Sequence, residues 1–142
     1  MKRILEAMIA VAVLATPVSA FAAKVTVTGA WVRALPGNAA GYFTMKNDGD
    51  KTIVLTGVKT AACGMPMLHK TSSGGGMASM SDVNTIPLAP HETIKFAPGG
   101  YHIMCMDPTA AVKPGKSVTM TFLFADKTSN TVTFAVKNAA GH

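Results

Sequence analysis

Short runs of β-branched, aromatic and other apolar residues recur along most of the chain, and Gly, Pro, Asn and Asp separate them. This pattern is typical of β-strands joined by turns, and no segment shows a convincing helical period. We therefore expect strands at 24–33, 41–47, 52–58, 63–70, 77–83, 92–96, 101–106, 117–125 and 130–136. The pattern predicts an all-β fold, specifically a β-sandwich.

The stretch SVTMTFLF shows the clearest alternation of apolar and polar positions. Val118, Met120, Phe122 and Phe124 occupy every second position, so they share one face of a strand. We expect that face to be buried in the core. In the first strand we interpret Trp31, in the sequence AWVR, as a core residue as well.

The N-terminal residues match a secretory signal peptide. Lys2 and Arg3 precede a largely apolar run at 7–15, and the small-residue sequence TPVSAFAA follows it. The apolar run is too short to span a bilayer. We predict a signal peptide at 1–22 and one domain at 23–142, located in the periplasm. No Cys lies beside the cleavage site, so we expect no lipid anchor.

The length and charge of the chain exclude several classes of protein. A chain of 142 residues fits one domain with a real core. The net charge is +6, but the positive side chains are scattered singly and form no basic run or basic amphipathic helix. We therefore expect a monomer that binds no nucleic acid.

The stretch GGYHIMCMD, residues 99–107, concentrates nitrogen and sulfur side chains. Because alternate residues of a strand point to the same side, His102, Met104 and Met106 share one face and Cys105 lies on the other. A His-x-Met pair on one face can hold a metal ion from two positions. Taken alone the pair is a weak signal, since Met is an ordinary core residue.

A second group of potential ligands lies upstream. His69 enters the Gly-rich turn SSGGG, and ten residues separate it from Met80. Twenty-one residues then precede His102 and one more precedes Met104, which gives the order H-x10-M-x21-H-x-M. Two thioethers and two neutral imidazoles form a soft ligand set, which suits Cu(I) better than Mg, Ca, Mn or Zn.

With this spacing the chain resembles the periplasmic copper chaperones of the PCu(A)C type, which carry the same His, Met, His, Met order. AWVRALPGNAAGYFTMKNDGD is similar to the first strand and hairpin of that family, and PGGYHIM is similar to its PGG-x-H-x-M stretch. The resemblance covers essentially the whole chain after the signal peptide. One departure is that Lys70 and Thr71 follow His69, where some members carry another Met.

The resemblance implies a fold, a cargo and a partner. The fold would be a cupredoxin-like Greek-key β-sandwich. The protein would be a carrier and not an enzyme, and it would deliver copper to the CuA centre of cytochrome c oxidase or to a copper-inserting assembly factor. The implied Cu(I) ligands are His69, Met80, His102 and Met104.

The remaining Met and His residues match no ligand position of this motif. For the methionines we expect packing around the site, and for the histidines exposure to solvent. The methionines are Met65, Met67, Met77 and Met106, and the histidines are His91 and His142.

The two cysteines, Cys63 and Cys105, belong to an exported chain and are therefore expected to form a disulfide. Regular strands would place Cys63 on the ligand-bearing face and Cys105 on the opposite one. A bulge at Gly64 or Pro66 would reset the alternation and allow the bond. If the cysteines were reduced instead, Cys105 would be a soft ligand next to Met104.

Three other functions fit parts of the sequence. A blue-copper protein needs a Cys and His pair on a loop, and Cys105 has no His after it until His142. A copper oxygenase with an N-terminal His is disfavoured by the expected cleavage sites, and enzymes that use C-x-x-C or G-x-S-x-G are disfavoured because neither motif occurs. A structural sandwich with a Met-rich core remains as the simplest alternative.

Overall fold

In the computed structural model the described residues form ten β-strands. The structure describes residues 22–74 and 77–142, and gives side chains for these except 72–79. Within those ranges no helix is long and apolar enough to cross a membrane. The expected signal peptide lies outside the described residues apart from Ala22. The strands are β1 (Val25–Leu35), β2 (Asn38–Asn47), β3 (Ile53–Lys59), β4 (Cys63–Gly74), β5 (Met77–Asp82), β6 (Ile86–Leu88), β7 (Thr93–Phe96), β8 (Tyr101–Pro108), β9 (Ser117–Phe124) and β10 (Ser129–Lys137).

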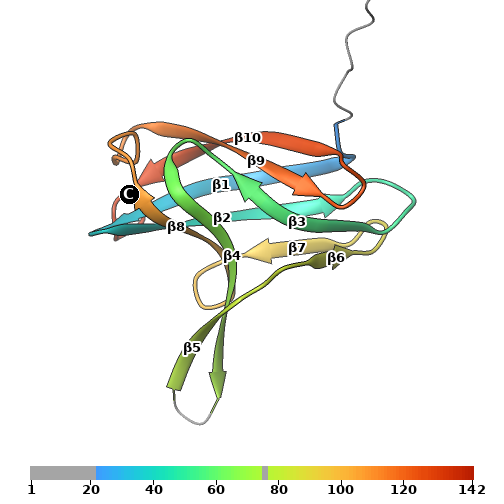
Figure 1. The fold of residues 1–142 in the computed structure, drawn as a ribbon, viewed down its shortest axis with the longest axis horizontal. Coiled ribbons are helices and arrows are strands. Elements are labelled where there is room, and N and C mark those ends of the chain that lie inside the picture. The colour runs from blue at the N-terminus through green and yellow to red at the C-terminus, as the bar shows by residue number, and fades with distance from the viewer. Residues whose placement is uncertain (1–21, 75–76) are drawn as a thin grey trace, which may run out of the picture.

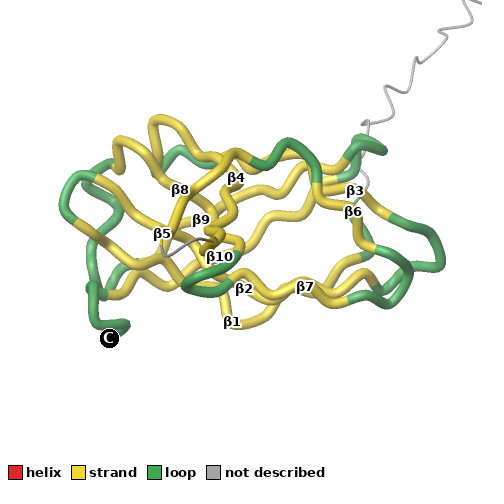
Figure 2. Tube along the Cα trace, turned by 90° about the horizontal axis from the view of Figure 1, so that it is seen from below, coloured by secondary structure: helices red, strands yellow, loops and turns green. Residues whose placement is uncertain are grey.

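The strands belong to one curled sheet with the order β5-β4-β8-β7-β2-β1-β10-β9-β3-β6, and β8 also pairs directly with β2. Most neighbours are antiparallel, but β1 and β10 are parallel, and so are β7 and β8. Curling the sheet brings β3 into contact with β4 and makes two layers, which Figure 2 shows edge-on. The predicted all-β Greek-key sandwich in a single domain is confirmed. The three-residue strand β6 is the one element that the sequence pattern did not predict.

An aromatic cluster fills the space between the layers. Phe43 of β2 stacks on Phe96 of β7 at 4.2 Å between ring centroids and lies 4.6 Å from Phe122 of β9. In β9 the four alternating apolar residues are all buried, as predicted. Burial of these side chains is the main favourable contribution to folding, and it fixes which face of each strand points inward.

Trp31 does not belong to this core, so that prediction is wrong. Its neighbour Val32 is fully buried, and Trp31 therefore projects from the outer face of β1. There its ring lies 4.9 Å from the ring of Tyr42, and the guanidinium of Arg33 lies 5.3 Å from the Trp31 centroid. Strand alternation sends adjacent residues to opposite sides, and here the smaller apolar residue takes the inside.

Strand β4 belongs partly to the sheet and partly to a projecting hairpin. Residues from Cys63 to Lys70 pair with β8, whereas residues from His69 to Gly74 pair with β5. Figure 1 shows the β4–β5 hairpin extending below the body of the sandwich. His69 and Lys70 therefore pair with both neighbours, and β4 leaves β8 after Lys70.

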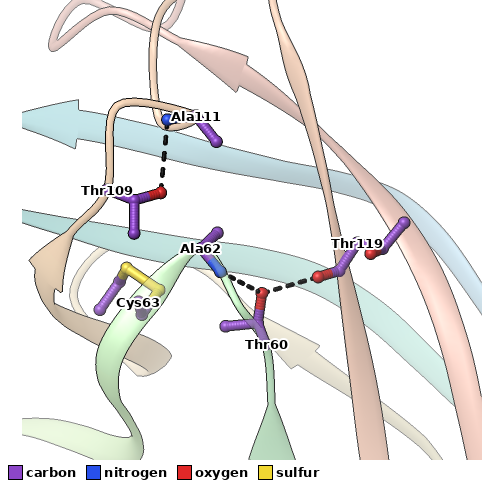
Figure 3. The surroundings of a disulfide bond; sticks show 7 residues. Thr60, Ala62, Cys63, Thr109, Ala111 and Thr119 are labelled. Atoms are coloured by element: carbon purple, nitrogen blue, oxygen red, sulfur yellow. Dashed lines mark hydrogen bonds between the residues drawn. A yellow bond between two sulfur atoms is a disulfide. The ribbon is translucent and has the colours of Figure 1, made fainter.

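Cys63 and Cys105 form a disulfide with a Cα–Cα distance of 5.4 Å (Figure 3). The expected bulge in β4 is absent, since the register of β4 on β8 is constant from Cys63 to Lys70. The irregular residue is instead Asp107 of β8, which has a positive φ of 50°. The disulfide ties together the two strands that carry His69 and His102.

Hydrogen bonds hold the chain on both sides of this disulfide. The Thr60 hydroxyl donates to the Thr119 carbonyl at 2.7 Å and accepts from the backbone N–H of Ala62 at 3.1 Å (Figure 3). The N–H of Thr109 donates to the Ala62 carbonyl at 2.9 Å. The ends of β4 and β8 are thus anchored to each other and to β9.

Candidate metal centre

The outer face of the sheet, meaning the side away from the aromatic core, carries the predicted ligands. His69 of β4 is the register partner of His102 of β8, and Met67 is the partner of Met104. Side chains of directly opposed residues point to the same side of a sheet. The intervening residue Ile103 is fully buried, so His102 and Met104 project outward as the alternation predicts.

Three of the four predicted ligands line one cavity of about 360 Å³ on this face: Met80, His102 and Met104. Tyr42 and Arg33 also line this cavity. Burial raises the pKa of Tyr42, although the charge of Arg33 opposes that shift. The cavity is therefore lined by thioethers, one imidazole and an un-ionised phenol.

His102 is 4% exposed, and only one of its ring nitrogens has a hydrogen-bond partner. Nδ1 lies 3.2 Å from the carbonyl oxygen of Gly100, an acceptor, so Nδ1 carries the proton and donates it. Nε2 is buried without a partner and keeps its lone pair. An unpaired buried polar group costs about 1–3 kcal/mol, a cost that a bond to a metal ion would offset.

The pKa of His102 lies below the ordinary value of 6.5. Burial is the main cause because it disfavours the charged imidazolium, and the nearby His69 acts in the same direction. The hydrogen bond to Gly100 opposes the shift. His102 is therefore neutral at pH 7, the form that binds metals.

His69 stands beside His102, with ring centroids 5.6 Å apart, but it is turned toward a carboxylate. Its Nε2 lies 2.7 Å from Oδ1 of Asp82, although not aligned for a hydrogen bond, and its Nδ1 is buried without a partner. Asp82 is the residue opposite His69 in the β4–β5 hairpin. A carboxylate next to a histidine that binds a metal typically orients the ring.

Sequence reasoning missed Asp82, and hairpin register could have found it. Gly74 and Met77 are register partners, and counting outward from them places Asp82 opposite His69 and Met80 opposite Thr71. Met80 and Asp82 are two residues apart and so share a face of β5. The hairpin thus presents the Met80 thioether to the cavity and the Asp82 carboxylate to His69.

The two methionine ligands differ in exposure. Met80 is 61% exposed, whereas Met104 is half-buried between β4 and β2. Core packing does not account for an exposed Met80. Nor is a site of harder ligands present, because the described residues contain no group of three or more His, Cys, Asp or Glu side chains placed to hold an ion. Imidazole and thioether together favour soft ions such as Cu(I).

A protein-family profile with the description "Putative lipoprotein LpqE-like" matches residues 25–136. The chain belongs to this LpqE-like family. One relative is "Putative lipoprotein Lxx21020" of Leifsonia xyli subsp. xyli, 32% identical over 121 residues, which are 82% of this chain and 72% of the relative. A second is the "Uncharacterized protein RP573" of Rickettsia prowazekii, 30% identical over 71% of this chain and 56% of its own length. The lipoprotein description of the family and of the Leifsonia relative indicates a family of exported proteins.

Solved structures similar to this LpqE-like chain are PCuAC domains. The copper-bound PCuAC domain from PmoF2 is 26% identical, with a TM-score of 0.67 over 83% of this chain and 96% of that domain. The Cu(I) form of DR1885 from Deinococcus radiodurans is 32% identical, with a TM-score of 0.64 over 77% of this chain and 75% of that protein. The resemblance to PCu(A)C proteins predicted from the sequence is confirmed.

The other methionines and histidines of the LpqE-like chain fall into two groups. His91 and His142 are exposed, as predicted. Met67 is half-buried, but Met65 and Met106 are 57% and 40% exposed, so packing around the site does not describe them. For Met77 only the backbone, at the start of β5, is described.

Proposed function

We propose that this LpqE-like chain is a periplasmic copper chaperone that binds one Cu(I) through His69, Met80, His102 and Met104. The cargo would be held by two imidazole nitrogens and two thioether sulfurs, a soft ligand set in which the thioethers have no proton to lose. Copper binding by the similar PCuAC domain from PmoF2 and by DR1885 supports the proposal.

One observation carries this proposal: two opposed histidines each keep a buried nitrogen without a hydrogen-bond partner. These atoms are Nε2 of His102 and Nδ1 of His69. The other nitrogen of each ring already has a neighbour, Gly100 in one case and Asp82 in the other. For His102 the hydrogen bond to Gly100 fixes the tautomer in which Nε2 offers its lone pair to a metal ion, and for His69 the nearby carboxylate favours an orientation that leaves Nδ1 free.

Copper transfer would proceed by ligand exchange. A thioether bonds Cu(I) without carrying charge, so a thiolate of the recipient can replace it one ligand at a time. No electron is transferred in such a step, and copper remains Cu(I). We propose the CuA centre of cytochrome c oxidase, or a copper-inserting assembly factor, as the recipient.

Each alternative function requires a feature that the described residues do not provide. A blue-copper site and a reduced Cys105 ligand both require a thiolate, and Cys105 is bonded to Cys63. A structural sandwich with a Met-rich core would bury its methionines, whereas Met80 is 61% exposed. A carrier therefore accounts for the site better than an electron-transfer or purely structural protein.

The decisive experiment is an anaerobic Cu(I) titration of the mature protein against a chromophoric Cu(I) chelator. We expect one tightly bound equivalent, and X-ray absorption at that ratio should show two nitrogen and two sulfur neighbours. The double variant His102→Ala, Met104→Ala should lose this equivalent. His91→Ala, which removes an exposed histidine on another part of the surface, is the matched control and should bind as the wild type does.

Two results would contradict the proposal: no Cu(I) binding by the wild type, or unchanged affinity in the double variant. The recipient is tested separately by mixing the Cu(I)-loaded protein with the soluble, copper-free CuA domain of cytochrome c oxidase. Copper that appears on that domain supports the proposed recipient. Copper that remains on this chain rules that recipient out and leaves the binding site unaffected.

A further inference from the structure

Methionine side chains continue the row of the two histidines along the outer face of β4 and β8. Met67 is opposite Met104, and Met65 is opposite Met106. The register is unbroken from these pairs to the histidine pair. Four thioethers therefore occupy two successive rungs of the same two strands.

The outermost rung is open to solvent. Met65 is 57% exposed and Met106 is 40% exposed, and both belong to the four large apolar side chains that are exposed among the described residues. Their neighbours Met67 and Met104 are half-buried. Exposing two apolar side chains opposite each other contributes nothing to core packing, so the pair calls for another explanation.

The spacing of these residues suits a single ion. Opposed side chains of antiparallel strands have Cβ atoms about 5 Å apart, and residues i and i+2 are about 7 Å apart along a strand. A methionine side chain has three rotatable bonds, and the third atom of the side chain is a polarizable sulfur. The sulfurs of Met65, Met67 and Met106 can therefore converge on one point above the sheet.

We propose that Met65, Met67 and Met106 form a second Cu(I) site that consists of thioethers only. Neutral thioethers select soft ions, and Cu(I) is the soft ion for which the neighbouring site is proposed. The proposal thus rests on the proposed function.

The second site is weaker than the first and is connected to it. It has no imidazole, and two of its three ligands are exposed to water that competes for the ion. Met104 of the first site is opposite Met67 of the second, so copper can move between the sites by successive ligand exchanges that begin with these two sulfurs. In the full series the four bonds to the first site break as three Cu–S bonds to the second form, and no electron or proton is transferred.

The test is a Cu(I) titration of the mature, disulfide-bonded protein under anaerobic conditions, with a strong chelator and then a weak one. The wild type should retain one equivalent against the strong chelator and two against the weak one. The triple variant Met65→Leu, Met67→Leu, Met106→Leu keeps the apolar surface but removes the sulfurs. It should retain one equivalent with both chelators.

A second readout is NMR of protein labelled with ¹³C at the methionine methyl groups. The second Cu(I) equivalent should shift the signals of Met65, Met67 and Met106 and leave the core residue Met120 unchanged. Met120→Leu is the matched control and should retain both equivalents.

The outcomes separate this inference from the proposed function. A wild type that binds one tight equivalent and no second one overturns the thioether site alone, and so does a triple variant that still binds two. No binding at all overturns the proposed function. A triple variant that binds copper normally but transfers it slowly to the CuA domain would identify the methionines as a docking surface and would likewise overturn the thioether site.

Discussion

His69 and His102 lie directly opposite each other on β4 and β8, with ring centroids 5.6 Å apart and ring planes at 76°. Backbone hydrogen bonds of the sheet set this separation, and the disulfide between the same two strands reinforces it. Met80, by contrast, depends on how the projecting hairpin is placed. The rigid half of the proposed site is therefore the histidine pair.

Removing His102 should weaken Cu(I) binding far more than removing Met80. His102 is 4% exposed and its free Nε2 is already oriented, whereas Met80 is 61% exposed. Loss of a residue that merely orients a ligand typically costs 10–100-fold in metal affinity, so His102→Ala should cost more than about 100-fold. Competition titrations of His102→Ala and Met80→Leu measure both losses. Equal losses of Cu(I) affinity in the two variants would contradict this prediction.

Asp82 should orient His69 for metal binding. Its Oδ1 lies 2.7 Å from Nε2 of His69, which leaves Nδ1 to bond the ion. We expect Asp82→Asn to lower Cu(I) affinity by about tenfold, the lower end for groups that orient a ligand. The control is Asp50→Asn, since Asp50 lies 3.9 Å from the exposed His91. Tighter binding by Asp82→Asn would mean that the carboxylate competes with the ion for Nε2.

The copper-free protein should lose stability in mild acid through His102. Burial holds the pKa of His102 in the folded state below 6.5, while the unfolded chain has the ordinary histidine value of about 6.5. The unfolded state therefore binds the proton more readily. The stabilising contribution of neutral His102 is present above pH 6.5 and is lost as the pH falls from there through the folded-state pKa.

Two measurements check this pH dependence. NMR of the histidine rings should show His102 titrating below pH 6.5 in the folded protein. In urea denaturation, the free energy of unfolding of His102→Gln should fall less than that of the wild type as the pH drops below 6.5. A folded-state pKa above 6.5 would refute the prediction.

Reducing the disulfide should destabilise the whole domain. Cys63 and Cys105 are 42 residues apart in sequence, and closing a loop of that length contributes about 4 kcal/mol in the chain-entropy model. Chemical denaturation of Cys63→Ala, Cys105→Ala against the wild type measures the loss. Copper affinity of the folded variant should fall less than in His102→Ala, because neither sulfur is a ligand. A variant as stable as the wild type would show that the bond adds little.

The strands and their inward faces could largely be predicted from the sequence, because alternation with one buried face is a local pattern. Val118, Met120, Phe122 and Phe124 in β9 are the clearest case. The pattern failed for β6, since three residues are too few to show a period. It also failed for Trp31, because both faces of β1 carry apolar residues and only the packing of Val32 decides which is inside.

The residues of the candidate site could be predicted from the sequence, but their arrangement in space could not. The spacing of His and Met residues identified the four candidate ligands, and strand alternation placed His102 and Met104 on one face. Asp82 was not predicted, because its position opposite His69 depends on the register of the β4–β5 hairpin. The sequence predicts a bulge in β4 that would bring Cys63 to the same face as Cys105. The irregular backbone is instead at Asp107, on the partner strand. Both misses concern pairing between segments, which one segment does not encode.

The four proposed ligands differ in exposure, and this difference sets the order in which they would release the copper ion. Met80, on the projecting hairpin, is the ligand that an approaching recipient meets first, and His102, at 4% exposed, is the last. If the proposed ligands hold copper, a partner shaped to displace the hairpin would remove it more easily than a small competitor would. The proposed carrier would then retain copper in free solution and release it when a recipient moves the hairpin aside.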